Sequence, residues 1–141
     1  MTQKQFDFVK IMSSNLQQFN FCEDVAIWVA CQMALETAYG TSNLVKTNCN
    51  FFGMKHPAYR ISLSCGSING HALYKCAYHS FFDYLLWLCS NGFRHVHLSN
   101  LESFLHLFAH TKYNPYMDSY ISTINNIKVS YEKRNQNRKE A

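Results

Sequence analysis

The spacing of apolar residues along the chain predicts a protein built mainly from helices. Four apolar residues recur at helical spacing near the start: Phe6, Val9, Met12 and Leu16. They predict a helix over residues 2–18, with the Thr2 hydroxyl as its cap. Residues 25–38 are apolar almost all the way round, which is typical of a helix buried in the core. Thr41 or Ser42 can then cap a short helical turn that reaches Lys46.

Two further helices are expected after residue 79. Ser80 and Asp83 fit a capping box before an apolar run, with Asp83 in place of the more usual Glu, and Gly92 would end this helix. Asn100 can cap a helix over residues 101–110. The pattern therefore gives Asp83 a structural role at a helix start.

A last helix is predicted after Asn114 and Pro115, a cap and first-turn pair that starts helices well. Apolar and aromatic residues follow at helical spacing: Tyr116, Tyr120, Ile124 and Ile127. Residues 132–141 are polar and charged, and we expect them to form a flexible tail.

Residues 47–77 have a different character, with prolines and glycines between short apolar runs. Residues 51–54 and 71–74 are each predicted to form a short strand. This segment contains no acidic residue. We expect a small β lobe, over about residues 48–78, inserted in a helical protein.

The chain has 141 residues, a length that predicts one domain. Its net charge is +4. The six cysteines form no C-x-x-C pair, so we expect no metal site and no cofactor. Cys22, Cys31 and Cys89 lie in apolar helical contexts typical of core residues. Cys65 and Cys76 could face each other across a hairpin, and whether they pair is left open.

Glu36 is the carboxylate whose position most needs an explanation. It falls in the last turn of the apolar helix if Gly40 is the C′ residue. The unpaired carbonyls at a helix end carry partial negative charge and repel a carboxylate. Apolar neighbours would raise its pKa further, and a protonated carboxyl group can serve as a general acid. The alternative is an ordinary ion pair with Lys46 or Lys55.

Four motifs in this order are similar to those of a known enzyme family. The run A-C-Q-M-A-L-E-T-A-Y-G-T-S, which ends at Ser42, resembles the A-Q-x-x-L-E-S-G-W-G-x-S signature of the endo-β-N-acetylglucosaminidases of glycoside hydrolase family 73. N-F-F-G-M-K, ending at Lys55, looks like that family's N-L-F-G-I-K. The segments Y-x-x-x-x-x-S-F-F-D-Y, ending at Tyr84, and Y-N-P-Y, ending at Tyr116, resemble its Y-x-S-x-x-x-S-F-x-D-Y and D-P-x-Y.

The resemblance implies a mainly α, lysozyme-like α+β domain over residues 1–131, with a small β-hairpin lobe above the cleft. Glu36 matches the family's catalytic acid, and Tyr116 matches a tyrosine near its cleft. Residues expected to contact substrate are Tyr39, Ser42, Asn50, Phe52, Lys55, Tyr78 and Tyr113. Alternatively, Phe52 is a core aromatic and Lys55 is a solvated charge. Tyr116 could also be the outermost member of the row of residues with which the last helix faces the core.

The chain also departs from the family pattern. Thr37, Ala38 and Tyr39 replace the usual Ser-Gly-Trp, Cys49 replaces the first Asn of an N-N pair, and Ala72 replaces an Arg. Tyr39 keeps a flat surface on which a sugar can stack.

The resemblance implies hydrolysis of the β-1,4 bond after N-acetylglucosamine in peptidoglycan. Because Asp83 is assigned to a helix cap, the sequence offers no second carboxylate as base or nucleophile. The substrate's own acetamide, or a water held by a tyrosine, would then attack the anomeric carbon. A lytic transglycosylase is an alternative, and a non-catalytic peptidoglycan-binding or phage structural module is another.

Peptidoglycan glycan strands are the expected partner. We expect a monomer without nucleic-acid binding or membrane insertion, because recognition motifs and long apolar runs are lacking. The first residues do not resemble a signal peptide. The expected route is synthesis in the cytoplasm, followed by action on the cell wall after lysis or dedicated export.

Overall fold

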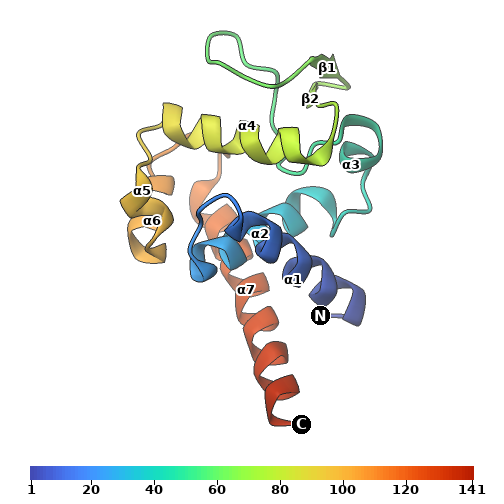
Figure 1. The fold of residues 1–141 in the computed structure, drawn as a ribbon, viewed down its shortest axis with the longest axis vertical. Helices are drawn as coiled ribbons and strands as arrows, with labels where there is room; N and C mark the ends of the chain where they lie inside the picture. Colours follow the sequence, from blue (N-terminus) through green and yellow to red (C-terminus); the bar gives the residue numbers. More distant parts are fainter. The chain divides into compact units, whose positions relative to one another are not determined.

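The computed structural model describes all residues from Met1 to Ala141, and it is mainly helical (Figure 1). Its elements in chain order are α1 (Gln3–Gln17), α2 (Glu23–Thr37), α3 (Asn43–Asn48), β1 (Gly66–Ile68), β2 (His71–Leu73), α4 (Ala77–Ser90), α5 (His95–Leu98), α6 (Leu101–Phe108) and α7 (Met117–Glu140). The predicted mainly α fold with a small β-hairpin is confirmed.

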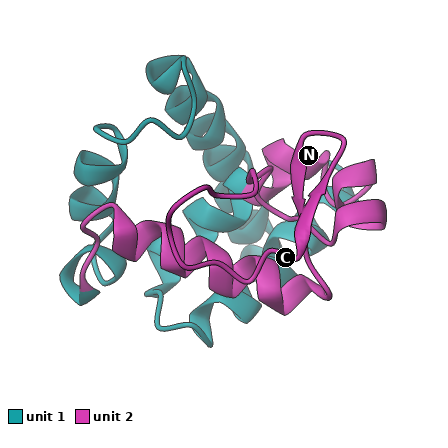
Figure 2. Ribbon diagram, turned by 90° about the horizontal axis from the view of Figure 1, so that it is seen from above, with its two compact units in different colours: residues 1–32, 95–141 teal, residues 33–94 magenta.

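The chain forms two compact units (Figure 2). Unit 1 contains Met1–Gln32 and His95–Ala141, and unit 2 contains Met33–Arg94. Helix α2 contributes to both, because the boundary falls between Gln32 and Met33.

Aromatic side chains from distant parts of the sequence build the core of unit 1. Trp28 of α2 is fully buried, and its ring centroid lies 5.6 Å from that of Phe104 and 5.1 Å from that of Phe108. Its Nε1 donates a hydrogen bond to Asn125 Oδ1 of α7 at 2.9 Å. This bond satisfies the only polar group of a buried indole.

Unit 2 contains the hairpin and α4. Strands β1 and β2 pair in antiparallel register, with Ser67 opposite Ala72. Between them Asn69 and Gly70 both have positive φ, as the tightest hairpin turns require. The Asn48 amide of α3 donates to the carbonyl oxygens of Ile68, His71 and Ala72, and so fastens the hairpin to α3.

Several predicted boundaries agree with the structure. Thr2 caps α1 in a capping box with Gln5. Asn100 caps α6 by accepting a hydrogen bond from the Ser103 backbone N–H at 2.9 Å. Gly92 follows the end of α4 with a φ of +86°.

Other predicted boundaries are wrong. Residues 51–54 form no strand, because the Asn50 side chain shapes them into a turn. Helix α4 begins at Ala77, ahead of the expected Ser80. Helix α7 begins at Met117, because the Asn114 side chain accepts a hydrogen bond from Tyr116 N and holds a turn before the helix.

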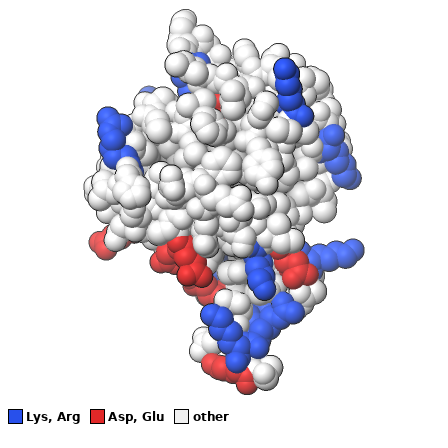
Figure 3. Space-filling model, viewed as in Figure 1, with Lys and Arg blue, Asp and Glu red and all other residues white.

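The segment expected to be a flexible tail is the end of α7. Arg134 donates to the Met1 carbonyl oxygen at 2.6 Å and to Gln3 Oε1 at 3.1 Å, and Arg138 lies over the Phe6 ring at 4.8 Å. Figure 3 shows acidic and basic side chains side by side where α7 ends. Local composition predicts disorder here, but contacts with α1 hold the segment.

All six cysteines are free. Cys31 is fully buried, as expected, whereas Cys65, Cys76 and Cys89 are exposed. The core position predicted for Cys89 is wrong, because this residue lies on the outward side of α4. No helix is both long and apolar enough to cross a lipid bilayer.

Candidate active site

Glu36 lies in the last turn of α2, which ends at Thr37, and its side chain is half-buried. A Cβ atom added to Gly53 would stand 2.6 Å from Glu36 Oε2, closer than real Cβ contacts. Gly53 also has a φ of +66°, which favours glycine. The loop of residues 50–54 therefore passes directly against the Glu36 carboxylate, and only glycine fits at the closest point.

The chain leaves α2 through three successive residues with positive φ: Ala38, Tyr39 and Gly40. Gly40 was expected to be the first residue past the helix, but Ala38 takes that position. Thr37 stabilises the turn, because its Oγ1 donates to the Met33 carbonyl oxygen and accepts from the Gly40 N–H. The half-buried Tyr39 thereby follows Glu36 within one tight turn.

Asn50 is fully buried and organises the loop that carries Gly53. Its Nδ2 donates to the carbonyl oxygens of Met54 at 2.8 Å and Ala72 at 3.1 Å. Its Oδ1 accepts from the backbone N–H groups of Phe52 and Met54. The buried Asn50 side chain therefore has no surface with which to contact a sugar. It shapes the loop beside Glu36 instead.

Phe52 is also fully buried, and its ring stacks on that of Tyr84 with centroids 4.0 Å apart. The structure therefore places it as a core aromatic, which is the alternative to a cleft position. Lys55 and Tyr78 are exposed, so both side chains reach the surface of unit 2. The Ser42 hydroxyl oxygen is buried and has no hydrogen-bond partner.

The two candidate tyrosines near residue 115 belong to unit 1. The Tyr113 ring lies 5.7 Å from that of Phe108 and 5.9 Å from that of Tyr120. Tyr116 is 76% exposed at the cap position of α7. Glu36 belongs to unit 2, so the structure brings it together with the 50–54 loop and leaves Tyr116 in the other unit.

Asp83 is the residue whose role the sequence pattern misassigned. It is not a cap, because α4 begins six residues earlier; its fully buried carboxylate accepts hydrogen bonds from several groups. Arg60 donates to both carboxylate oxygens, at 2.9 and 3.0 Å, and the Leu63 N–H and the Tyr74 hydroxyl add further bonds. A buried acid in an apolar helix requires a cation, and this requirement could have pointed to Arg60.

These hydrogen bonds set the charge of Asp83. Burial acts to raise its pKa, but the bonds from Arg60, Tyr74 and Ser62 outweigh burial, so the pKa lies below its ordinary value. The pKa of Tyr74 is raised, first by burial and then by its bond to Asp83. Asp83 is therefore an ionised group held inside the protein, without an open face for substrate.

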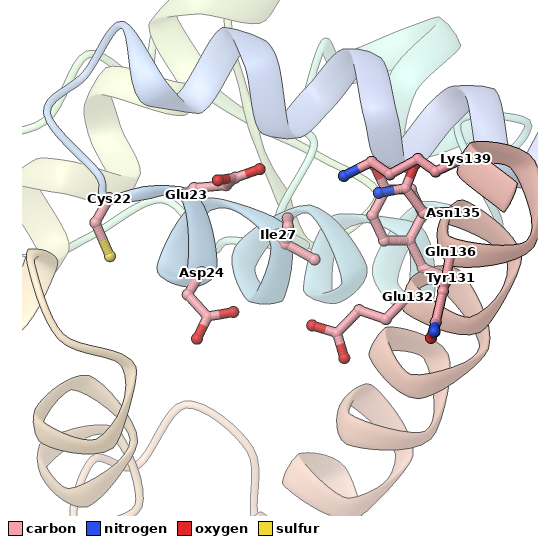
Figure 4. Close-up of a pocket in the computed structure, with 9 residues that line it drawn as sticks. All are labelled: Cys22, Glu23, Asp24, Ile27, Tyr131, Glu132, Asn135, Gln136 and Lys139. Atoms are coloured by element: carbon pink, nitrogen blue, oxygen red, sulfur yellow. The ribbon is translucent and has the colours of Figure 1, made fainter.

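A separate pocket of about 540 Å³ lies in unit 1, between the start of α2 and the second half of α7 (Figure 4). No candidate site residue lines it. Two of its acids are paired with Lys128, whose Nζ lies 3.1 Å from Asp24 and 2.5 Å from Glu132. The structure contains no group of three or more acidic, His or Cys side chains that could hold a metal ion.

One family model matches most of the chain. Residues 18–133 match the glucosaminidase model, described as mannosyl-glycoprotein endo-beta-N-acetylglucosaminidase. No curated protein and no solved structure matches the chain. The matched range includes Glu36, the 50–54 loop and the Asp83 network.

Proposed function

Because the chain belongs to the mannosyl-glycoprotein endo-β-N-acetylglucosaminidase family of glycoside hydrolases, we propose that it hydrolyses peptidoglycan at the β-1,4 bond after N-acetylglucosamine. Glu36 is the proposed general acid and protonates the leaving glycosidic oxygen. Tyr39, Ser42, Lys55, Tyr78 and Tyr113 are proposed substrate contacts, and Tyr116 is a proposed catalytic group.

The observation that carries this proposal is the difference between the two acids of unit 2. Glu36 and Asp83 are the only Asp or Glu residues in Met33–Arg94. Asp83 is fully buried and bound by Arg60, whereas Glu36 is partly exposed beside the 50–54 loop. Carbonyls at the end of α2 disfavour a negative charge on Glu36, which suits a group that holds a proton.

A single accessible carboxylate in unit 2 favours a mechanism in which the substrate supplies the nucleophile. The acetamide oxygen would attack the anomeric carbon as the glycosidic bond breaks and Glu36 protonates the leaving oxygen. Water would then open the cyclic intermediate and give up a proton to the Glu36 carboxylate. In the second version a water held by Tyr116 attacks directly.

The stereochemistry of the product separates these two versions. Two successive displacements at the anomeric carbon retain its configuration, whereas one direct attack by water inverts it. Proton NMR of the first-formed sugar ends, recorded before they mutarotate, would show the β anomer for acetamide participation. The α anomer would support direct attack by water.

Mass spectrometry of digested peptidoglycan tests the proposal as a whole. Free reducing N-acetylglucosamine ends are expected. Anhydro-muramic ends would instead identify a lytic transglycosylase, and the absence of products would identify a non-catalytic peptidoglycan-binding or phage structural module. We propose that the protein acts as a monomer on the cell wall, after lysis or dedicated export.

A further inference from the structure

Residues 56–64, here called the lobe loop, connect the 50–54 loop to the hairpin in unit 2. The two ends of the lobe loop are close together, because His56 Nδ1 and Ser64 Oγ are hydrogen-bonded at 2.9 Å. The Ser64 hydroxyl also donates to the Gly66 carbonyl oxygen at 2.8 Å, at the start of β1. In Figure 1 the lobe loop rises beside α4, ahead of β1.

The middle of the lobe loop is fastened to α4 by Arg60. Its guanidinium donates to both carboxylate oxygens of Asp83, and its side chain is only 15% exposed. The Leu63 N–H donates to the same carboxylate at 3.1 Å. Two-point attachment by a planar guanidinium fixes direction as well as distance, so the loop is fastened to α4 at this point.

The anchored loop presents apolar side chains to solvent on both sides of Arg60. Tyr59 has a relative exposure of 101% and Ile61 one of 83%, although the residue between them is anchored. A phenol ring left in water contributes no burial free energy to folding, so the stability of the loop gives no reason for a tyrosine at this position. A fully exposed aromatic ring next to an anchored residue is a feature of surfaces that bind a ligand.

The charge of unit 2 indicates what kind of ligand this is. Unit 2 has five Lys and Arg residues and two Asp and Glu residues, a net charge of +3 out of +4 for the chain. Residues 37–82 contain no acid at all, and Lys55, next to the lobe loop, is exposed. Peptidoglycan combines flat sugar faces with the carboxylates of its stem peptides, so it complements both the ring and the charge.

We infer that the lobe loop is a contact surface for the peptidoglycan strand, on which Tyr59 stacks against a sugar ring and which Arg60 positions through Asp83. This inference rests on the proposed function, and it adds a binding contact outside the motif residues. Tyr59 is a binding residue here and takes no part in the bond cleavage. Arg60 is a positioning residue, since it acts through the shape of the loop.

Binding to insoluble peptidoglycan tests this inference when turnover is blocked by Glu36→Gln. In that background Tyr59→Ala is expected to raise the dissociation constant about three- to tenfold, the range for loss of one aromatic contact. Tyr59→Phe is the matched control, because it keeps the ring, and it should bind as the parent does. Arg60→Lys keeps the charge but loses the paired hydrogen bonds from the guanidinium to both Asp83 oxygens. It should weaken binding while the circular dichroism spectrum of the protein stays native.

Each result decides a different point. Equal binding by the parent and its Tyr59→Ala variant overturns the inference, even if product analysis supports the proposed function. Equal losses in Tyr59→Phe and Tyr59→Ala overturn stacking, since the hydroxyl would then carry the contact. If the parent fails to bind and the wild type releases no products, the proposed function fails together with this inference.

Discussion

Among single residues, Gly53 constrains the candidate acid most directly. It combines a left-handed backbone with the space that Glu36 Oε2 occupies. The position and accessibility of the Glu36 carboxylate therefore depend on a residue that has no side chain. The buried Asn50 amide shapes the 50–54 loop, and this loop places Gly53 against the Glu36 carboxylate.

Glu36→Gln should abolish hydrolysis while the protein stays folded. The amide is nearly isosteric with the acid but has no acidic proton, and a general acid contributes about 10²- to 10⁴-fold. Release of reducing sugars from purified peptidoglycan measures the loss, and the melting temperature shows whether folding is kept. A variant with more than half of the wild-type activity would exclude Glu36 as the acid.

Gly53→Ala should lower activity by displacing the Glu36 carboxylate. The new Cβ would stand 2.6 Å from Oε2, and the left-handed backbone adds strain of about 1–2 kcal/mol. Gly70→Ala is the matched control, since Gly70 also has positive φ but nothing within 4 Å of the added Cβ. We expect both variants to lose stability and Gly53→Ala alone to lose at least tenfold in turnover; equal turnover in the two would contradict the clash.

At the scale of elements, the Arg60–Asp83 pair joins the lobe loop to α4. Asp83 is fully buried and the Arg60 side chain is 15% exposed. Removing one partner of a buried pair typically costs about 3–5 kcal/mol, because the other charge stays largely buried. Asp83→Asn is therefore a change to the interior of unit 2. The cost is well above the roughly 1 kcal/mol of a lost helix cap.

The same pair predicts acid sensitivity. Because the pKa of Asp83 is lowered by folding, its stabilising contribution is complete above its ordinary pKa of 3.8 and declines as the pH falls through the folded-state pKa. A tenfold difference in proton affinity between the folded and unfolded states corresponds to about 1.4 kcal/mol of stability. Thermal melting of wild type and Asp83→Asn should give a difference in melting temperature that narrows below about pH 4. A constant difference would show that ionised Asp83 does not stabilise the fold.

The sequence predicts some elements well because their signals are local. Thr2, Asn100 and Gly92 mark helix ends through contacts with residues only a few positions away. The start of α4 is different, because Asp83 resembles a cap in sequence but pairs with Arg60, 23 positions earlier. The family resemblance identifies Glu36 as the candidate acid, whereas its adjacency to Gly53 and the burial of Asn50 and Phe52 depend on the packing of the lobe.

At the scale of the whole molecule, the two chain ends stabilise each other inside unit 1. Arg134 and Arg138 of α7 contact Met1, Gln3 and Phe6 of the first helix segment. The Phe6 ring also stacks on Tyr131 with centroids 4.9 Å apart. The charged C-terminal segment is thus a structural part of this unit.

Deletion of residues 134–141 should therefore destabilise the protein. The loss of two cation–π contacts to Phe6 and of the Arg134 hydrogen bonds is expected to cost about 1–3 kcal/mol. Differential scanning calorimetry should show a melting temperature lower by several degrees. Deletion of residues 139–141 alone is the control and should have little effect. An unchanged melting temperature in the longer deletion would restore the flexible-tail interpretation.

The positions of the cysteines allow unfolding to be followed by thiol alkylation. Burial raises the pKa of Cys31 to about 12, so its thiolate is scarce at neutral pH, whereas Cys65, Cys76 and Cys89 are exposed. A pulse of iodoacetamide on the native protein should alkylate the exposed three and spare Cys31. Cys31 belongs to unit 1 and the exposed three to unit 2. Peptide mapping after pulses at rising urea concentrations would therefore give the urea concentration at which unit 1 opens and Cys31 becomes alkylated. No engineered probe is needed.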